Sequence, residues 1–139
     1  DGINDGILEN APEAEVVARQ NASNTDLGMK VTESVLLAKP EVNVICACDD
    51  FTAIGAYEAV SAMQKIPDNF YIGGCDATDE GKEKMKVENS VYRSSCNLFP
   101  YEAGEDLAEA MYKYLTEKQE DAVVQRRYEP VWQRDVVEN

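Results

Sequence analysis

Residues 40–60, PEVNVICACDDFTAIGAYEAV, carry the pattern that decides the fold. Residues 42–48 are nearly all apolar, as expected of a strand that is covered on both faces. Asp49 and Asp50 follow directly, and apolar residues at helical spacing then predict a helix over about residues 52–65. A buried strand that leads through two aspartates into a helix is typical of a parallel α/β sheet.

Short β-branched runs alternate with helical segments on both sides of this stretch. Because helices that connect strands produce parallel pairing with right-handed crossovers, the predicted class is α/β. We expect three layers, with a mostly parallel sheet and helices on both of its faces. Strands are predicted over residues 14–19, 42–48, 70–75, 91–96 and 128–134, and helices over about residues 1–9, 26–38, 52–65, 79–88 and 101–118.

Composition and charge exclude several classes of function. The chain has 139 residues and no histidine, so imidazole-based catalysis and imidazole metal sites are impossible. Its 27 acidic and 13 basic side chains give a net charge of −14, which argues against nucleic-acid binding because phosphates are repelled. A hydrophobic content of 44% and a charged content of 29% indicate one soluble globular domain. We expect no metal and no cofactor.

Polar side chains follow the predicted strands at the point where each strand ends. The second strand leads to Asp49 and Asp50, the third to Asp76, the fourth to Asn97, and the first to Asn24. Because the carboxyl ends of parallel strands share one edge of a sheet, we expect these side chains to meet there. Ionised carboxylates accept hydrogen bonds from two donors at once, which suits a neutral ligand with many hydroxyl groups, such as a sugar. A cationic amine, or magnesium with phosphates, is the alternative ligand.

Helix capping is the other explanation for an aspartate that lies between a strand and a helix. For Asp50 we favour capping, and for Asp79 capping is the complete explanation. Asp49 and Asp76 each lie one residue nearer the strand than a cap requires, so capping and ligand binding both stay open for them. Asn24 also stands where it can cap the helix that follows.

The four cysteines have three explanations. We favour small apolar residues buried in the core, which is the common role of a free cysteine. A disulfide between adjacent strand ends comes second, and a thiolate metal site comes last because the spacing matches no zinc pattern. The residues concerned are Cys46, Cys48, Cys75 and Cys96.

Four segments together resemble the type 1 periplasmic sugar-binding proteins. Residues 40–60 are similar to a proline-led strand of that family, with its aspartate pair and its Ala-x-Gly-Ala helix. Residues 72–78, IGGCDAT, resemble the next strand with its aspartate, alanine and threonine. Residues 98–104, LFPYEAG, resemble the family's Gln-x-Pro-Tyr-x-x-Gly segment, and residues 130–139 resemble its closing strand.

The resemblance implies a two-lobed protein that delivers a sugar to the membrane permease of an ABC importer. It implies that residues 1–98 and 129–139 form the C-terminal, ligand-binding lobe, so that the chain is a fragment with half of the site. Residues 99–128 would form a hinge and a helix that packs on the absent N-terminal lobe. It further implies an extracytoplasmic location, in the periplasm or lipid-anchored at the cell surface, and no enzymatic activity.

The resemblance also implies roles for single residues. Asp49 matches a ligand-contacting asparagine or aspartate, Asp76 matches the aspartate that accepts from sugar hydroxyls, and Asp50 matches the aspartate that starts the helix. Asn24 lies near a loop position where an aromatic residue often stacks on the sugar, and an amide lacks that stacking face. At the hinge, Leu98 stands at the family's glutamine position, and Asn97 next to it would substitute for the glutamine if the register slips by one residue.

Two other functions remain open from the sequence. One is the effector-binding domain of a lactose-repressor-type transcription regulator, which is a close relative of the same fold. The other is a magnesium-dependent phosphoryl-transfer enzyme built on Asp49, Asp50 and Asp76. That chemistry also needs a lysine or a phosphate-cradling glycine loop, and the sequence places neither beside these aspartates.

The helix predicted over residues 101–118 carries an apolar stripe that must be covered. In a two-lobed protein the other lobe would cover it. In this chain we expect the stripe to drive self-association, with exchange of residues 99–128 between copies as one route. The stripe consists of Ala103, Leu107, Ala110, Met111 and Tyr114.

Overall fold

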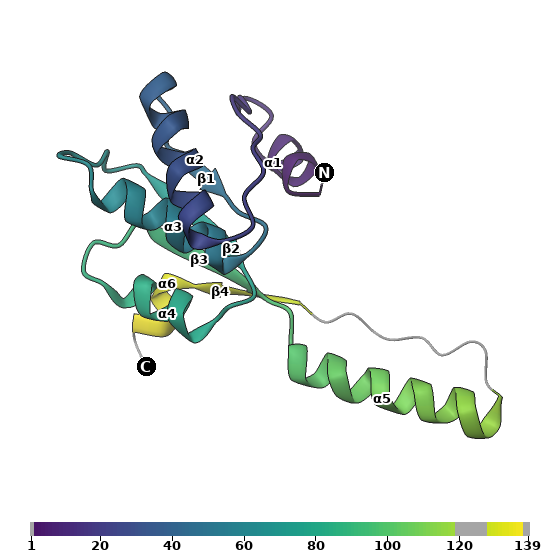
Figure 1. Ribbon diagram of the computed structural model, residues 1–139. Helices are drawn as coiled ribbons and strands as arrows, with labels where there is room; N and C mark the ends of the chain where they lie inside the picture. The colour runs from purple at the N-terminus through teal and green to yellow at the C-terminus, as the bar shows by residue number, and fades with distance from the viewer. Residues whose placement is uncertain (1, 119–127, 138–139) are drawn as a thin grey trace.

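The computed structural model describes residues 2–118 and 128–137, and Figure 1 shows their helices and strands in chain order. The alternation of strands and helices agrees with most of the sequence prediction. The elements are α1 (Gly2–Asn10), α2 (Thr25–Ala38), β1 (Val44–Cys46), α3 (Asp50–Ser61), β2 (Tyr71–Cys75), α4 (Asp79–Lys86), β3 (Tyr92–Asn97), α5 (Pro100–Glu117), β4 (Glu129–Trp132) and α6 (Gln133–Val137).

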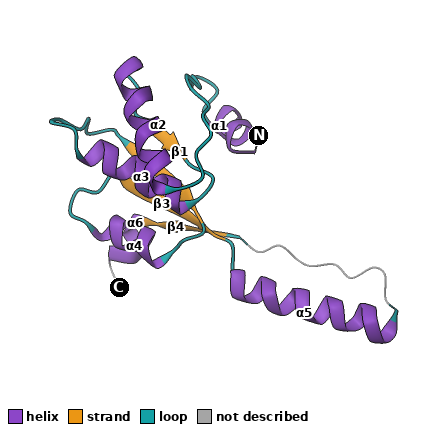
Figure 2. Cartoon of the chain, viewed as in Figure 1, coloured by secondary structure: helices purple, strands orange, loops and turns teal. Residues whose placement is uncertain are grey.

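The four strands form one sheet in the order β1-β2-β3-β4, drawn in orange in Figure 2. β1, β2 and β3 run parallel, and β4 runs antiparallel to β3. This arrangement confirms the predicted α/β class with a mostly parallel sheet. It also brings the carboxyl ends of β1, β2 and β3 to one edge, where the predicted ligand contacts lie.

Two predictions about the start of the sheet are wrong. Residues 14–19 form no strand but run as a loop between α1 and α2 (Figure 2), because no described strand pairs with their backbone. β1 was expected to be covered on both faces, yet Val44 and Cys46 are exposed. Strand propensity at residues 14–19 does not by itself supply a strand partner. Because these residues do not pair, β1 stands at the edge of the described sheet, where fewer neighbours cover its side chains. At the other end, the last strand is shorter than predicted, because residues 133–137 form α6.

The core lies where α3 and α4 pack against the sheet. Partly buried Leu36 of α2 and Val136 of α6 close it from two further elements. One charged residue, Asp50, belongs to the fully buried set together with large apolar and aromatic side chains. The set consists of Tyr92, Phe70, Ile54, Ile72, Met85, Val60 and Asp50.

Helices α2 and α3 approach each other closely because glycines line their contact. A Cβ added at Gly28 would lie 3.1 Å from the Thr52 Cα, and one added at Gly55 would overlap the carbonyl oxygen of Thr25. Glycine is required here for lack of space, since neither residue has a positive φ. This packing fixes the first turn of α2 against α3.

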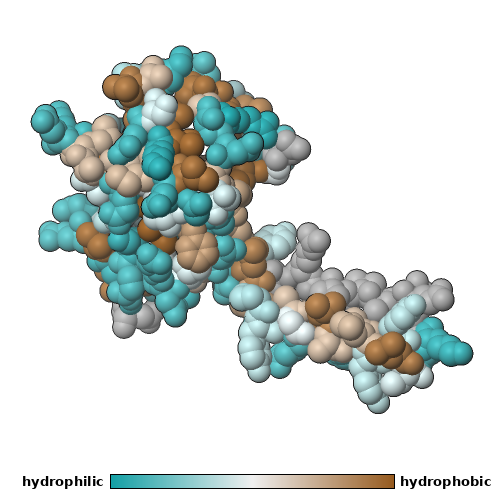
Figure 3. All heavy atoms as spheres, in the orientation of Figure 1, coloured by the Kyte–Doolittle hydropathy of each residue, from teal (hydrophilic) through white to brown (hydrophobic). Residues whose placement is uncertain are grey.

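Helix α5 projects away from the rest of the chain (Figure 1), and none of its residues is buried. Figure 3 shows hydrophobic side chains along this arm. Leu107, Met111 and Tyr114 of the predicted apolar stripe are all more than half exposed. Residues 119–127, in the segment predicted to return from the other lobe, lie outside the described residues. No described helix is long and apolar enough to span a lipid bilayer.

Candidate functional site

Asp49 caps helix α3 at the carboxyl edge of the sheet. Its Oδ1 accepts a hydrogen bond from the Thr52 backbone N–H at 2.7 Å, and its Oδ2 accepts from the Thr52 hydroxyl at 3.1 Å. The prediction that Asp50 is the cap was therefore wrong by one residue, because the helix begins at Asp50. The same shift occurs at α4, where Thr78 is the cap and Asp79 is the first helical residue.

Asp76 follows β2 in a conformation that is unusual for a residue with a side chain. Its φ is 106°, and its backbone N–H donates to the Cys96 carbonyl at the end of β3 at 2.8 Å. Partial burial raises the pKa of the Asp76 carboxyl, and the negative charges of Asp50 and Asp49 raise it further. A hydrogen bond from the Asp50 backbone N–H opposes this rise. Because β1 and β2 are parallel neighbours, Asp49 and Asp76 follow their carboxyl ends along the same edge, where they form one negatively charged rim.

Asp50 is 0% exposed, and its carboxylate is occupied from within the chain. Oδ1 accepts hydrogen bonds from the Tyr92 hydroxyl at 2.6 Å and the Ser95 hydroxyl at 2.5 Å. Oδ2 accepts from the Thr78 backbone N–H at 2.7 Å and the Thr78 hydroxyl at 2.9 Å. The carboxylate therefore joins β3 to the start of α4 and does not face the rim.

Asn97 ends β3, directly beside the end of β2. The register pairs Cys75 with Cys96, so Asp76 and Asn97 are the next residues on neighbouring strands. The Asn97 Oδ1 accepts from the Phe99 backbone N–H at 3.0 Å. This bond turns the chain toward α5, and the amide nitrogen of Asn97 has no hydrogen-bond partner among the described residues.

Asn24 stands apart from the other predicted residues. It caps α2 as expected, with Oδ1 accepting from the Leu27 backbone N–H at 2.9 Å, and its side chain is exposed. Its position depends on the packing of α2 against α3. The structure thus brings Asp49, Asp50, Asp76 and Asn97 together at the sheet edge, and no described hydrogen bond connects Asn24 to them.

The partners of Asp50 were not predicted from the sequence. Tyr92 and Ser95 lie on β3 and both donate to the same oxygen. Burial and the hydrogen bond to Asp50 raise the pKa of the Tyr92 phenol. The register of β2 and β3 is irregular between Tyr92 and Ser95, so the alternation of side chains along the strand does not predict that both residues reach Asp50. Thr78 gave a usable signal, since it is the last residue of the IGGCDAT segment that carries part of the family resemblance.

The cysteines are only partly where they were predicted. Cys46 and Cys48 are exposed, so the prediction that they are buried was wrong for these two. Cys75 and Cys96 are part-buried register partners, and all four thiols are free. Partial burial, then the neighbouring Cys96 and Asp76, raise the pKa of Cys75. No group of three or more acidic residues or cysteines in residues 2–118 and 128–137 is arranged to hold a metal ion.

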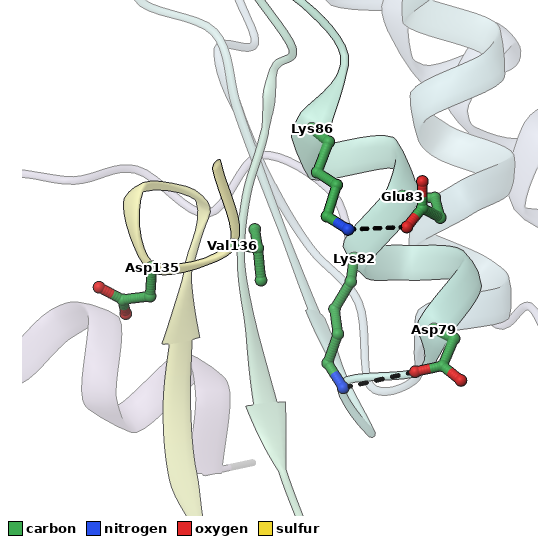
Figure 4. Close-up of a pocket in the computed structure, with 6 residues that line it drawn as sticks. All are labelled: Asp79, Lys82, Glu83, Lys86, Asp135 and Val136. Atoms are coloured by element: carbon green, nitrogen blue, oxygen red, sulfur yellow. Dashed lines mark hydrogen bonds and ion pairs between the residues drawn. The ribbon is translucent and has the colours of Figure 1, made fainter. Parts of the chain in front are cut away.

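A surface hollow of about 470 Å³ is lined by residues of α4 and α6, which Figure 4 draws as sticks. Two lysines of α4 that line the hollow pair with acids of the same helix, Lys82 with Asp79 at 3.7 Å and Lys86 with Glu83 at 2.9 Å. None of the predicted ligand contacts lines this hollow. We therefore assign the candidate site to the rim formed by Asp49, Asp76 and Asn97.

The raised pKa of Asp76 makes a prediction about stability. Because the folded state holds this proton more tightly than the unfolded state, stability falls as pH rises from the unfolded value of about 4 through the folded pKa. Asp76→Asn should therefore raise the free energy of unfolding at pH 7 and flatten its pH dependence. Urea denaturation between pH 4 and pH 7 measures this, with Glu41→Gln as an exposed control. Equal pH profiles for Asp76→Asn and the unchanged chain would contradict the prediction.

Comparison with known proteins identifies the family. The sequence pattern of the periplasmic binding protein domain matches residues 1–119, whereas no curated protein sequence matches the chain. The structure is similar to a 5-methylthioribose transporter solute binding protein from Thermotoga lettingae (TM-score 0.84, 24% identity, covering 100% of this chain and 44% of that one).

It is also similar to a solute binding protein from Actinobacillus succinogenes with bound D-allose (TM-score 0.82, 22% identity, covering 96% of this chain and 47% of that one). A third similar structure is the arabinose transporter's binding protein from Shewanella sp. ANA-3 (TM-score 0.80, 20% identity, covering 96% and 45%). The chain thus spans less than half the length of these proteins. With its family pattern matched over residues 1–119, the chain belongs to the periplasmic binding protein domain family.

Proposed function

We propose that the protein is the solute-binding component of a sugar ABC importer, and that this chain supplies one half of its ligand site. The observation that carries the proposal is the placement of Asp49 and Asp76 on one rim, each partly exposed to solvent. The proteins of similar structure support a sugar ligand, since their structures hold bound 5-methylthioribose, D-allose and L-arabinofuranose.

The chemistry of the rim suits hydroxyl groups. Each ionised carboxylate offers about four acceptor positions, so the capping bonds of Asp49 leave capacity for ligand donors. The amide nitrogen of Asn97 supplies a donor for a ring or hydroxyl oxygen. Asn24 offers an amide in place of an aromatic stacking face. The rim therefore binds through directional hydrogen bonds, with carboxylates as the main acceptors.

The second proposed partner, after the sugar, is a membrane permease, and this proposal follows from the family. We propose that the whole protein works outside the cytoplasm, where it delivers its ligand to the membrane permease of the importer without catalysing a reaction. The phosphoryl-transfer alternative has less support, because Asp50 is buried and bonded to neutral donors at each of its oxygens. Only Asp49 and Asp76 of the three aspartates remain open to an external ligand.

A nuclear magnetic resonance titration of the 139-residue chain tests the proposal. The ligands are D-allose, L-arabinose, 5-methylthioribose and, separately, magnesium chloride. Because one lobe leaves half of the contacts in water, we expect an affinity near 1 mM, about −4.1 kcal/mol, for the best sugar. Saturable shifts should appear at the amides of Asp49, Asp76 and Asn97. Shifts with magnesium and none with any sugar would contradict the proposal.

Two variants make the titration specific. Asp76→Asn and Asp49→Asn each keep the size of the side chain but replace an acceptor oxygen by a donor nitrogen. We expect each to weaken sugar binding at least tenfold, while Glu41→Gln, which is exposed and outside the rim, leaves it unchanged. Equal affinity in all three variants would show that the sugar binds elsewhere.

We further propose that the chain self-associates through the exposed apolar stripe of α5. The double variant Leu107→Asp/Met111→Asp places two charges on that stripe and should remove association. Light scattering should then report the monomer mass of 15.4 kDa. Glu105→Ala, on the opposite side of α5, should leave the association unchanged. A monomeric unmodified chain would contradict the prediction.

A further inference from the structure

The turn that follows β2 is held in a conformation that amino acids with a Cβ rarely adopt. Asp76 has a φ of 106° and Ala77 a φ of 51°, both in the positive range that favours glycine. Such a backbone persists only where the surroundings determine it strongly, and it is concentrated at ligand sites. The groups that hold residues 76–78 therefore also direct the carboxylate of Asp76.

Each backbone N–H of the turn has a defined acceptor. The Asp76 N–H donates to the Cys96 carbonyl at 2.8 Å, and the Ala77 N–H donates to the Ser95 hydroxyl at 3.0 Å. The Thr78 N–H donates to the Asp50 Oδ2 at 2.7 Å. Ser95 in turn donates its hydroxyl hydrogen to the Asp50 Oδ1. Two of the three turn amides are thus held, directly or through Ser95, by one carboxylate.

The position of Asp50 in the chain connects the turn to the rim. Its side chain holds Thr78 directly, at 2.7 Å from the Thr78 N–H, and holds Ala77 through Ser95. Asp49, the residue before it, caps the helix that Asp50 begins. The turn that carries Asp76 is therefore held by the residue next to Asp49.

Two glycines leave the room that the Asp50 carboxylate needs. A Cβ at Gly74 would lie 2.5 Å from the Asp50 Oδ1, and a Cβ at Gly81 would lie 2.6 Å from its Oδ2. Neither glycine has a positive φ, so lack of space is the reason that no side chain fits there. At Gly81 the Asp50 carboxylate is the nearest obstacle, whereas at Gly74 the Tyr92 hydroxyl lies nearer still. The space around Asp50 is thus shaped from β2 and from α4 at once.

We infer that Asp50 and Ser95 are positioning residues that hold the turn at 76–78 and thereby direct the Asp76 carboxylate into the ligand rim. The inference deepens the proposed function and rests on it for the role of Asp76, whereas the control of the turn stands on the contacts alone. Asp50 acts through Thr78 and Ser95, and it does not touch the ligand itself.

The test compares three variants of the chain by nuclear magnetic resonance. Asp50→Asn leaves one acceptor oxygen where the carboxylate has two, and Ser95→Ala removes the acceptor of the Ala77 N–H, so amide hydrogen exchange at Ala77 and Thr78 should accelerate at least tenfold. The scalar couplings of Asp76 and Ala77 should also leave their positive-φ values. Tyr92→Phe is the matched control, because it removes another donor to the same carboxylate without touching the turn. It should lower the midpoint of unfolding but leave the turn signals unchanged.

The outcomes separate this inference from the proposed function. Unchanged signals at Ala77 and Thr78 in Asp50→Asn and Ser95→Ala would overturn the inference, whatever the sugars do. If Asp50→Asn does not fold, Ser95→Ala decides alone, because it keeps the carboxylate. If no sugar shifts the signals of the unmodified chain, that result would count against the proposed function. The amide exchange rates would still decide whether Asp50 and Ser95 hold the turn. If Asp50→Asn or Ser95→Ala changes the signals of the turn and also loses the sugar-induced shifts, the result supports both the inference and the proposed function.

Discussion

We expect Gly55→Ala to lower the free energy of unfolding by about 3 kcal/mol, the upper end of the usual loss from overpacking. The added Cβ would overlap the carbonyl oxygen of Thr25 and lie 2.7 Å from the backbone nitrogen of Met29. Both obstacles are backbone atoms of α2, so no side-chain rotation relieves them. Helices α2 and α3 would have to separate, and chemical denaturation followed by circular dichroism measures the loss.

Gly104→Ala provides the matched control for this substitution. Gly104 lies on the projecting α5, and a Cβ there meets nothing within 4 Å. Because alanine is favoured over glycine inside a helix by about 0.5–1 kcal/mol, this variant should be at least as stable as the unmodified chain. If Gly55→Ala retained full stability, the close contact of α2 with α3 would not exist in solution.

Phe70→Ala should have the largest effect of a truncation in the core, a loss of about 3–5 kcal/mol. Phe70 is 1% exposed and belongs to the hydrophobic cluster between the sheet and its helices. Truncation removes its apolar contacts and leaves a cavity that the neighbours fill only in part. Since a domain is stable by about 5–15 kcal/mol in total, the midpoint of urea denaturation should fall strongly.

The next residue along the chain is the control for this truncation. Tyr71 is 45% exposed, and its ring lies 5.6 Å from the Arg93 guanidinium carbon. An exposed cation–π contact contributes about 0.5–1 kcal/mol, so Tyr71→Ala should lose no more than that. Similar losses for Phe70→Ala and Tyr71→Ala would mean that the side chains of these two residues are not buried and exposed as described.

The sequence predicted the fold class because strand and helix periods differ clearly along this chain. It could not show whether residues 14–19 find a strand partner, since pairing depends on groups that are distant in sequence. It also misplaced the start of α3. Asp49 and Asp50 are both chemically able to cap a helix, and only the direction in which the chain leaves β1 decides between them.

The rim was predictable because the ends of parallel strands meet at one edge. That rule alone placed Asp49, Asp76 and Asn97 correctly relative to the sheet. It did not predict that the Asp50 carboxylate is buried, because the surroundings of this residue are assembled from separate elements. The contacts of Asp50 with Tyr92 and Ser95 span 42 and 45 residues of sequence, and no local pattern reports them.

The glycine of α4 beside Asp50 has an evolutionary consequence. If Asp50 were replaced by alanine, the volume it vacates would become available to a methyl group at position 81, where the carboxylate is the nearest obstacle. Gly81→Ala should then act as a second-site suppressor in that background, although it is harmful alone. Gly74→Ala should not, because the Tyr92 hydroxyl still occupies the space of its Cβ. Positions 50 and 81 should consequently vary as a linked pair, and a selection for restored folding of Asp50→Ala should recover Gly81→Ala.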